Sequence, residues 1–187
     1  MDVDGSKLRL LRASVQDWNT ERQIARLSLG GGLDDPYDVV LQGVSLQGLD
    51  LSGADLTDAD LRDADLRHAN LAGANLSRAD LSGALFAGSE LVRADLTLAN
   101  LDHCNLESAE MGDTRLLAVD LATARGLLSV RHRFSSYVDT RTIEKCRQSL
   151  IDRREPGFTV WQFLLNSGVP PWIVSSLNAG STLPQFQ

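Results

Sequence analysis

Apart from its carboxylates, this protein has few side chains that can bind a metal or transfer a proton. The chain has 187 residues, with three histidines and two cysteines: His68, His103, His132, Cys104 and Cys146. It contains no Gly-x-Ser-x-Gly nucleophile motif and no glycine-rich phosphate loop. The one glycine run, Gly30-Gly31-Gly32, lacks the Lys-Ser/Thr that a phosphate site needs. Whether the remaining groups meet depends on the elements that carry them.

Residues 39–123 divide into 17 consecutive blocks of five, without an insertion. The middle of this region reads ADLTD ADLRD ADLRH ANLAG ANLSR ADLSG. The third residue is Leu in 15 of the 17 blocks, and Phe86 and Met111 take its place in the other two. The first residue is usually Ala and the second is mostly Asp or Asn. A fixed short period of this kind indicates a repeat architecture.

A period of five fits neither a helix, with 3.6 residues per turn, nor a strand, with a period of two. On a straight helix, successive leucines would rotate by about 140° and would not share a face. A chain that turns a corner every five residues instead points every Leu inward, with Ala as a second, smaller inward residue. Asp, Asn and the last two residues then face water or form the corners. The sequence therefore predicts an all-β solenoid.

The A(D/N)LXX pattern resembles the pentapeptide-repeat family. The resemblance implies a right-handed quadrilateral β-helix with four blocks per coil, and hence about four coils here. With about 4.8 Å between stacked strands, the rod is about 20 Å long. Its two open ends would expose core and unpaired backbone, so we expect α-helical caps at both.

Four blocks per coil place residues 20 apart on the same side of the rod, which separates the candidate ligands. His68 and His103 are 35 residues apart and fall on different sides, so we expect no metal shared between them. Cys104 takes an inward position, and Cys146 falls on the apolar face of a predicted helix. The carboxylates point outward from a convex surface, whereas acid–base catalysis needs a cleft. We therefore expect no enzymatic activity, no cofactor and no metal.

The flanking regions lack the repeat and carry helical patterns. Residues 1–38 form the predicted N-terminal cap, in which Leu8, Leu11, Val15 and Trp18 have helical spacing. A capping box of Thr20 and Gln23 predicts a second helical segment. Residues 124–187 form the predicted C-terminal helical segment. Its helices would begin at Asp139 or Thr140, at Thr159, and at Pro170-Pro171.

The same flanks carry a second, narrower resemblance. Residues 10–19 (LLRASVQDWN) and 163–173 (FLLNSGVPPWI) are similar to segments before and after the repeats of certain bacterial pentapeptide-repeat proteins. In those proteins the second segment often leads into a Toll/interleukin-receptor (TIR) domain, which cleaves NAD or assembles signalling scaffolds. The resemblance implies a position for such a domain after Gln187.

Charge is unevenly distributed along the chain. Residues 39–123 carry 14 acids and 5 bases, a net charge of −9, whereas residues 124–187 carry a net +4. One predicted outward column contains Asp60, Asp80, Asn100 and Asp120. The Asn between the acids relieves repulsion, which favours a solubilising role over a dedicated anionic site.

An alternative function follows from the resemblance, because some pentapeptide-repeat proteins are dimeric rods that mimic DNA and bind DNA gyrase. A rod of about 20 Å matches only about six base pairs of duplex, at 3.4 Å per step. A gyrase modulator is therefore the alternative interpretation and not the first one. The negative charge also disfavours direct binding of nucleic acid.

The leading candidates for protein contact are breaks in the pattern. Leu85, Val92 and Leu98 take outward positions on neighbouring sides, and a cluster of exposed apolar side chains indicates a docking surface. A second candidate surface is the basic C-terminal segment with Arg153, Arg154, Trp161 and Trp172. The sequence thus predicts a non-enzymatic scaffold that binds a protein partner or a second copy of itself. Two cysteines, no apolar run of about 20 residues and an acidic N-terminus predict a reducing, cytoplasmic location.

Overall fold

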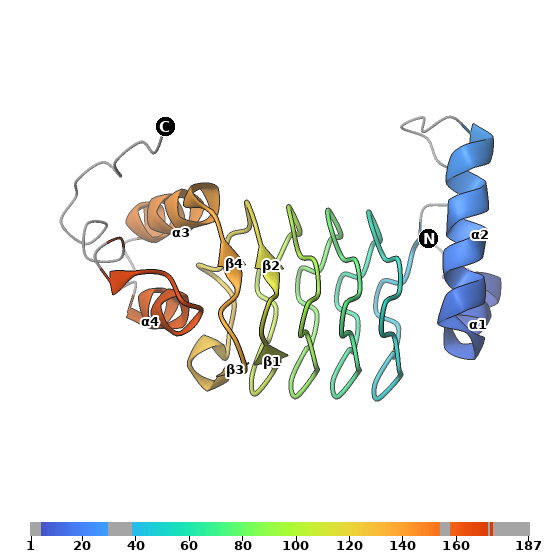
Figure 1. Cartoon of the computed structure of the whole chain (residues 1–187), viewed down its shortest axis with the longest axis horizontal. Helices are drawn as coiled ribbons and strands as arrows, with labels where there is room; N and C mark the ends of the chain where they lie inside the picture. The colour runs from blue at the N-terminus through green and yellow to red at the C-terminus, as the bar shows by residue number, and fades with distance from the viewer. Residues whose placement is uncertain (1–4, 30–38, 154–157, 172, 174–187) are drawn as a thin grey trace.

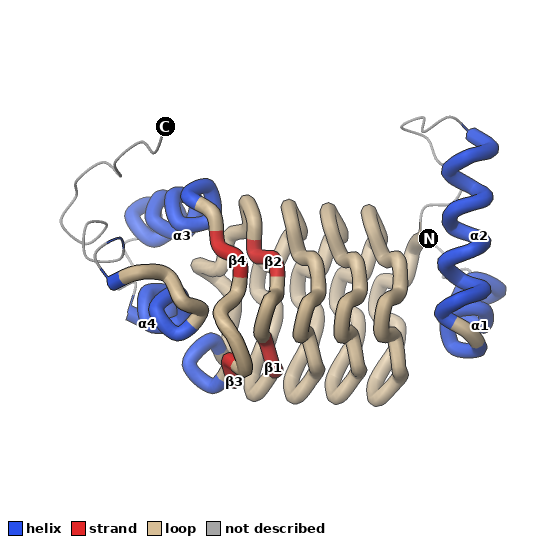
Figure 2. The backbone as a smooth tube through the Cα atoms, in the orientation of Figure 1, coloured by secondary structure: helices blue, strands red, loops and turns tan. Residues whose placement is uncertain are grey.

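The centre of the molecule is a coil that advances one turn every 20 residues (Figure 1). A computed structural model describes residues 5–29, 39–153, 158–171 and 173. Parallel bridges join residues 20 apart, from Val40↔Asp60 to Asn105↔Arg125. On one side of the coil, for example, Leu61 N–H donates to Asp80 O over 2.8 Å, and Asp80 N–H donates to Ala59 O over 2.9 Å. The path is mostly turns between single bridges, as the tube in Figure 2 shows.

Each block ends in a tight corner. Ala64 N–H donates to Leu61 O over 3.1 Å, which closes a turn around Arg62 and Asp63. From Gly43 to Ala118 the fifth residue of each block has a positive φ, and ten of these residues are not glycine, among them His68 at 59° and Leu98 at 62°. Each left-handed non-glycine residue costs about 1–2 kcal/mol. The coil therefore depends on its core and its hydrogen-bond ladder to hold these corners.

The second residue of the block has a structural task at the corner. The Asp80 carboxylate accepts a hydrogen bond from Ser82 N–H over 3.1 Å, and the Asn100 amide oxygen accepts one from Asp102 N–H over 3.1 Å. Asp and Asn are favoured in such turns because their short side chains reach the backbone two residues on. The recurrence of these residues thus reflects turn formation as well as solubility.

The third and first residues of the blocks fill the interior. Every third-position side chain from Leu41 to Leu121 is at most 1% exposed, including Phe86 and Met111. Cys104, Ser89 and Thr114 take the buried place that Ala usually fills. Each buried large apolar side chain contributes about 1.5–3 kcal/mol before chain entropy is counted. The inward pattern read from the sequence therefore matches the core.

The coil continues past the last in-phase block. Strand β1 (Glu110–Met111) pairs in parallel with β3 (Arg131–His132), and β2 (Arg115–Leu116) pairs with β4 (Tyr137–Val138). The paired residues are now 21 and 22 apart instead of 20. A 3-10 helix, Leu127–Ser129, lies in this last turn. Insertions therefore end the sequence period while the coil itself still pairs.

Two helices lie across the first coil (Figure 1). Helix α1 spans Gly5–Ala13 and α2 spans Val15–Leu29. Ser14 separates them, and its hydroxyl accepts a hydrogen bond from Asp17 N–H over 3.1 Å. The predicted helix start at Thr20 is wrong, because Thr20 lies inside α2 and donates its hydroxyl to Gln16 O over 2.9 Å.

Side chains of α2 bind the open backbone edge of the first coil. Trp18, 2% exposed, donates Nε1–H to Asp55 O over 2.8 Å. Asn19 donates to Gly53 O over 2.9 Å and accepts from Asp55 N–H over 2.8 Å. Within the described residues no earlier coil pairs with these groups, and the helix takes the role of a neighbouring strand.

Two further helices, α3 (Thr140–Arg153) and α4 (Phe158–Asn166), lie at the other end of the coil (Figure 1). The Asp139 carboxylate accepts from Thr142 N–H over 2.8 Å and so caps the start of α3. Helix α4 buries Val160, Phe163 and Leu164. Among the described residues, no helix combines the length and apolar character needed to cross a membrane.

Candidate interaction surfaces

The carboxylates of the predicted acidic column accept hydrogen bonds from neighbouring side chains. Arg62 donates to both carboxylate oxygens of Asp60, over 2.8 and 2.7 Å, and this hydrogen bonding holds the pKa of Asp60 below its ordinary value. The Asn100 amide donates to Asp80 over 3.0 Å. Asp60 and Asp80 are therefore hydrogen-bonded to neighbouring side chains of the same or the next coil.

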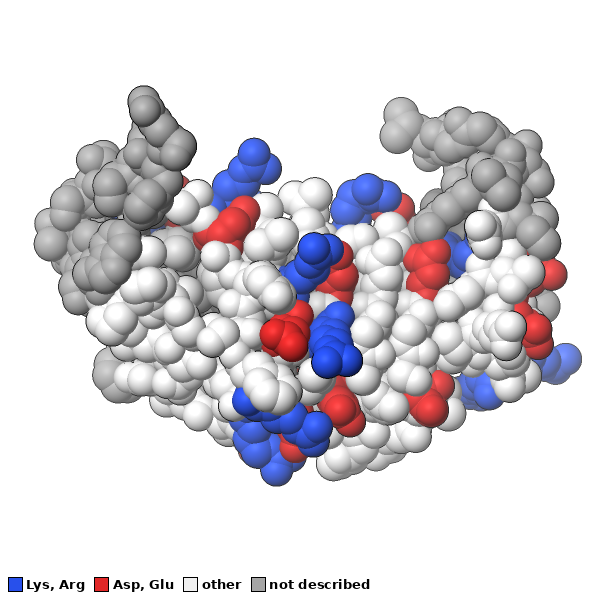
Figure 3. Space-filling view, viewed as in Figure 1, with Lys and Arg blue, Asp and Glu red and all other residues white. Residues whose placement is uncertain are grey.

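Ion pairs of the same kind cover the whole repeat region. Each of its five arginines lies within 4.0 Å of a carboxylate: Arg62–Asp60, Arg67–Asp65, Arg78–Asp58, Arg93–Asp113 and Arg115–Asp95. Arg131 and Arg133 likewise contact Glu110. On the face seen in Figure 3, basic side chains lie beside acidic ones. The surface is mixed in sign despite the net charge of −9.

The column breaks between Asn100 and Asp120. Asn100 pairs with Asp80 below it, but no bridge joins it to Asp120. Helix α3 binds this last segment instead: Lys145 Nζ donates to Ala118 O over 2.7 Å, and the Ser149 hydroxyl donates to Asp120. At the preceding corner the Thr142 hydroxyl accepts from Val119 N–H over 3.2 Å and donates to Leu116 O over 2.7 Å. The predicted stacking of Asp120 on Asn100 is therefore wrong, because α3 holds the segment of Asp120.

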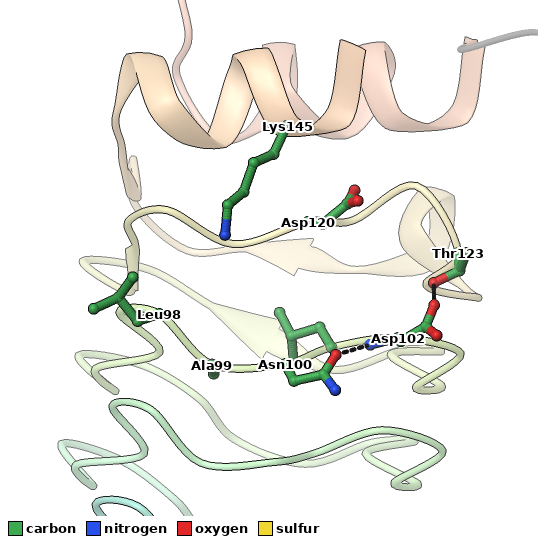
Figure 4. Close-up of a pocket in the computed structure, with 8 residues that line it drawn as sticks. Leu98, Ala99, Asn100, Asp102, Asp120, Thr123 and Lys145 are labelled. Atoms are coloured by element: carbon green, nitrogen blue, oxygen red, sulfur yellow. Dashed lines mark hydrogen bonds between the residues drawn. The ribbon is translucent and has the colours of Figure 1, made fainter. Parts of the chain in front are cut away.

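A slot of about 390 Å³ opens where the ladder is broken. We call it the side slot; its lining residues are Leu98, Ala99, Asn100, Leu101, Asp102, Asp120, Thr123 and Lys145. In Figure 4, Lys145 reaches down from α3 near Leu98, whereas Asp102 and Thr123 lie at the opposite end and are joined by a hydrogen bond. The slot thus has a cationic and an anionic end.

The three apolar pattern breaks do not form one surface. Leu85 lies on the side of Asp65 and Asn105, and Val92 lies on the next side. Leu98 lies at a corner one side further on and is 51% exposed, while the other two are half-buried. The structure therefore places Leu98 in the lining of the side slot, which Leu85 and Val92 do not line.

The predicted C-terminal surface is described only in part. Trp161 is partly buried on α4 and packs against the core. Arg153 is the last residue of α3. Arg154 and Trp172 lie outside the described residues. A surface that combines all four remains a prediction.

The sequence reading missed three exposed side chains of the last coil. Leu128, Phe134 and Tyr137 are 53%, 60% and 58% exposed, and with Leu98 they are the large hydrophobic residues exposed in the described part of the chain. All three lie after residue 123, where the period of five has ended. The period of five assigns no side of the coil to such residues. The sequence did contain one signal for them, because Phe134 and Tyr137 are aromatic residues outside the repeat.

The histidines and cysteines contribute no assembled chemical site in the described residues, where no three potential metal ligands gather. Burial raises the pKa of Cys104 and of Cys146 to about 12, so both thiols are poor nucleophiles at neutral pH. His132 lies against Phe163 of α4, with ring centroids 5.1 Å apart. Both of its ring nitrogens are buried without a hydrogen bond, and burial lowers its pKa.

Comparison with known proteins gives one family match. The model of pentapeptide repeats matches residues 37–73 and 74–113, with eight copies. A comparison with curated proteins gives no match.

Solved structures of the same kind are similar to the chain. HetL, involved in heterocyst differentiation regulation in Nostoc sp. strain PCC 7120, is 36% identical over 46% of this chain and 42% of its own, with a TM-score of 0.45. A second Nostoc pentapeptide repeat protein is 37% identical over 51% of this chain and 78% of its own, with a TM-score of 0.44. QnrB1, a plasmid-mediated fluoroquinolone resistance protein, is 15% identical over 60% of this chain and 65% of its own, with a TM-score of 0.32. The chain thus spans less than half of HetL, and the likeness to QnrB1 carries no functional information.

Proposed function

Since the chain belongs to the pentapeptide-repeat family, whose members are generally interaction modules, we propose that it is a non-enzymatic scaffold that associates with itself. The helices at the two ends act as caps in this proposal, so that the rod grows no further by strand pairing. Association then occurs through its side.

The observation that carries the proposal is the position of the exposed apolar side chains. Leu98 and Tyr137 flank one side of the last coils: Leu98 N–H donates to Leu117 O over 2.8 Å, and Tyr137 pairs with Arg115 two residues before Leu117. Phe134 precedes Tyr137 by three residues and is more than half exposed. We call Leu98, Phe134 and Tyr137 the C-terminal patch. Aromatic residues beside arginine are typical of the buried centre of protein interfaces.

Sedimentation velocity over a range of concentrations tests self-association. We expect the mass of the wild-type chain to rise with concentration and the double variant Leu98→Ser/Tyr137→Ser to remain monomeric. Leu128→Ser is the matched control, because Leu128 is equally exposed but lies in the 3-10 helix. A wild-type chain that stays monomeric up to about 100 μM, or a double variant that associates like the wild type, contradicts the proposal.

A finer form of the proposal names the assembled effector as a TIR-type domain, on the same polypeptide or on a partner. It is supported by the similarity of residues 10–19 and 163–173 to flanks that accompany such domains. Reading the source gene beyond codon 187 tests it: a frame that continues into a TIR domain supports the assignment, and an immediate stop codon removes its main support. A cytoplasmic location is part of this proposal and fits two buried, free cysteines.

The alternative is a DNA mimic that modulates DNA gyrase, and the net charge of −9 on residues 39–123 favours it. The ion pairs of the five arginines weaken it, because a duplex presents an unbroken row of negative charge. A supercoiling assay with purified gyrase separates the two functions. We expect no inhibition and no protection from quinolones at micromolar chain, and either effect would favour the alternative.

A further inference from the structure

One inward column of the coil ends in a histidine. The inward residues of successive turns on this side are Leu71, Leu91 and Met111, and all three are fully buried. The pairing of β3 with β1 places His132 opposite Met111. Because paired residues of parallel strands point to the same face, the His132 ring lies over the end of the apolar column. An ionisable ring thus occupies a place that leucine fills in the coils below.

Helix α4 covers the His132 ring. The ring lies against Phe163, which is fully buried, with the two ring centroids 5.1 Å apart. The same helix buries Leu164 and packs against the 3-10 helix of the last coil. Just after the end of α4, Ser167 O accepts a hydrogen bond from Ser136 N–H of the coil over 2.9 Å. The contact between α4 and the coil is therefore largely apolar, and His132 lies within it.

This contact favours the neutral form of His132. Both ring nitrogens are buried, and neither makes a hydrogen bond. A neutral imidazole leaves one donor and one acceptor unpaired there, whereas a protonated ring leaves two donors and a charge unpaired. Burying an unpaired charge costs far more than burying an unpaired polar group. Burial accordingly holds the pKa of His132 below 6.5.

The charged groups around His132 do not compensate a positive ring. Its neighbours on the same strand, Arg131 and Arg133, are themselves cations. Helix α4 and the 3-10 helix carry no ionisable side chain. Glu107 lies under Gly126, before the start of the 3-10 helix. The other carboxylates of the coils beneath β3 each lie within 4.0 Å of an arginine: Glu110–Arg131, Glu110–Arg133, Glu90–Arg133 and Asp113–Arg93.

We propose that His132 is a pH-sensitive switch, in which protonation of its ring releases α4 from the end of the coil while the coil itself stays folded. An imidazolium needs two hydrogen-bond acceptors, and water provides them only after Phe163 has moved away. Release exposes Phe163 and Leu164 on α4 and the apolar end of the column at Met111. Acid therefore uncovers an apolar surface that α4 covers at neutral pH. This inference goes beyond the scaffold proposal and does not depend on it, because the release of α4 is intramolecular.

Acid favours the released state of α4. The docked helix favours the neutral ring, so the released state takes up the proton more readily, and release increases as the pH falls below 6.5. One proton changes the equilibrium constant for release by at most about tenfold per pH unit. Well above pH 6.5 the ring is neutral in both states, and the equilibrium constant no longer depends on pH through His132.

Amide spectra of the ¹⁵N-labelled full chain between pH 8 and pH 5 test the proposal, at a concentration where sedimentation shows a monomer. We expect the amides of Phe163 and Leu164 to move toward random-coil shifts below pH 6.5 and to return at pH 8. The amides of Leu71 and Leu91, inside the coil, are the internal control and should keep their shifts. Amides of α4 that stay unchanged down to pH 5 overturn the proposal, and so does a coil that unfolds together with α4.

Two variants test the assignment to His132. His132→Leu restores the residue of the lower coils and should reduce the release at pH 5 about tenfold. His103→Gln is the matched control, because the His103 side chain is 59% exposed, and it should release α4 as the wild type does. Release of His132→Leu with the wild-type midpoint overturns the proposal.

A direct titration keeps the proposal testable if His132→Leu itself disturbs the docking of α4 at pH 8. The proton on Cε1 of the His132 ring is then followed in the wild-type chain. We expect its titration midpoint to lie below pH 6.5, together with the movement of the Phe163 amide. A midpoint at or above pH 6.5 overturns the proposal. The mass measurement of the scaffold proposal is independent of these outcomes.

Discussion

The two halves of the coil share a core but differ on the outside. In the blocks from residue 49 to residue 83 the second residue is always Asp or Asn. Its side chain accepts a hydrogen bond from the backbone N–H two residues further on. From residue 84 to residue 138 the same position also holds Leu85, Glu90, Glu110 and Arg115. All the exposed large hydrophobic side chains of the described residues lie in this second half.

The difference teaches which part of the repeat is under structural constraint. The inward Leu position persists in both halves because every coil must fill the same narrow interior. The outward position contributes only one local hydrogen bond per block, about 0.5–1.5 kcal/mol. In the second half several blocks lack this hydrogen bond. The C-terminal patch and the side slot both lie in that half.

The largest expected effect compares a core leucine in each half. Leu66→Ala, in the closed first half, should lower the free energy of unfolding by about 2–5 kcal/mol. Leu101→Ala should cost less, although Leu101 is equally buried, because the slot beside it lets the wall relax into the cavity. Urea unfolding of both variants measures the difference. A larger loss for Leu101→Ala would show that the slot is not a weak point of the core.

A smaller effect compares two glycines with the same backbone requirement. Gly126 has φ 74°, and a Cβ placed on it would lie 2.4 Å from Glu107 N. Gly73 has φ 66° and open space around it. Gly73→Ala should cost only the left-handed penalty of about 1–2 kcal/mol. Gly126→Ala should cost about 1–3 kcal/mol more, because the backbone of the previous coil must move. Equal melting temperatures would mean that the last coil is loosely held.

The second half should begin to lose stability at a higher pH than the first half. Burial lowers the pKa of His132 from 6.5, so the unfolded chain takes up its proton first, and stability falls as the pH drops below 6.5. Arginine hydrogen bonds hold the pKa values of Asp60 and Asp65 below 3.8, so their contribution is lost only below pH 3.8. Arg131 and Arg133, which flank His132, are bound to Glu110, and α4 carries no ionisable side chain.

Thermal melts between pH 8 and pH 3 test this separation. We expect His132→Phe to remove the decline that starts near pH 6.5 and to leave the one below pH 3.8. Persistence of the first decline in the variant would assign it to another group.

The smallest expected effect comes from exchanging Leu and Asn at the outward second position of the block. Leu85→Asn introduces the side chain that closes the turn in the first half and should stabilise the chain by at most about 1 kcal/mol. Asn105→Leu, on the same side one coil later, removes the bond that Asn105 accepts from Glu107 N–H over 3.0 Å and should destabilise it by a similar amount. Chemical unfolding of the pair measures both. A destabilising Leu85→Asn would mean that Leu85, half-buried, packs against its neighbours.

Much of the coil could be predicted because each block places the same positions inward and the same positions outward. Leu61 and Leu81 are inward for the same reason, and Cys104 is buried because it takes the place of Ala. The helix start at Ser14 was missed because Thr20 and Gln23 offer a capping pattern of equal strength. The exposed Phe134 and Tyr137 follow an insertion, where the period no longer gives a side of the coil.

The sequence by itself determined that this chain winds into a coil with a leucine core, because a period of five leaves no other way to bury every third residue of a block. Only the tertiary structure decided where the coil opens. Asp120 fits the repeat as well as Asp80 does, and the period of five continues through its block. Thr142, Lys145 and Ser149 bind its segment from α3, more than 20 residues further along the chain. That competition between a helix and a neighbouring coil exists only once both are folded.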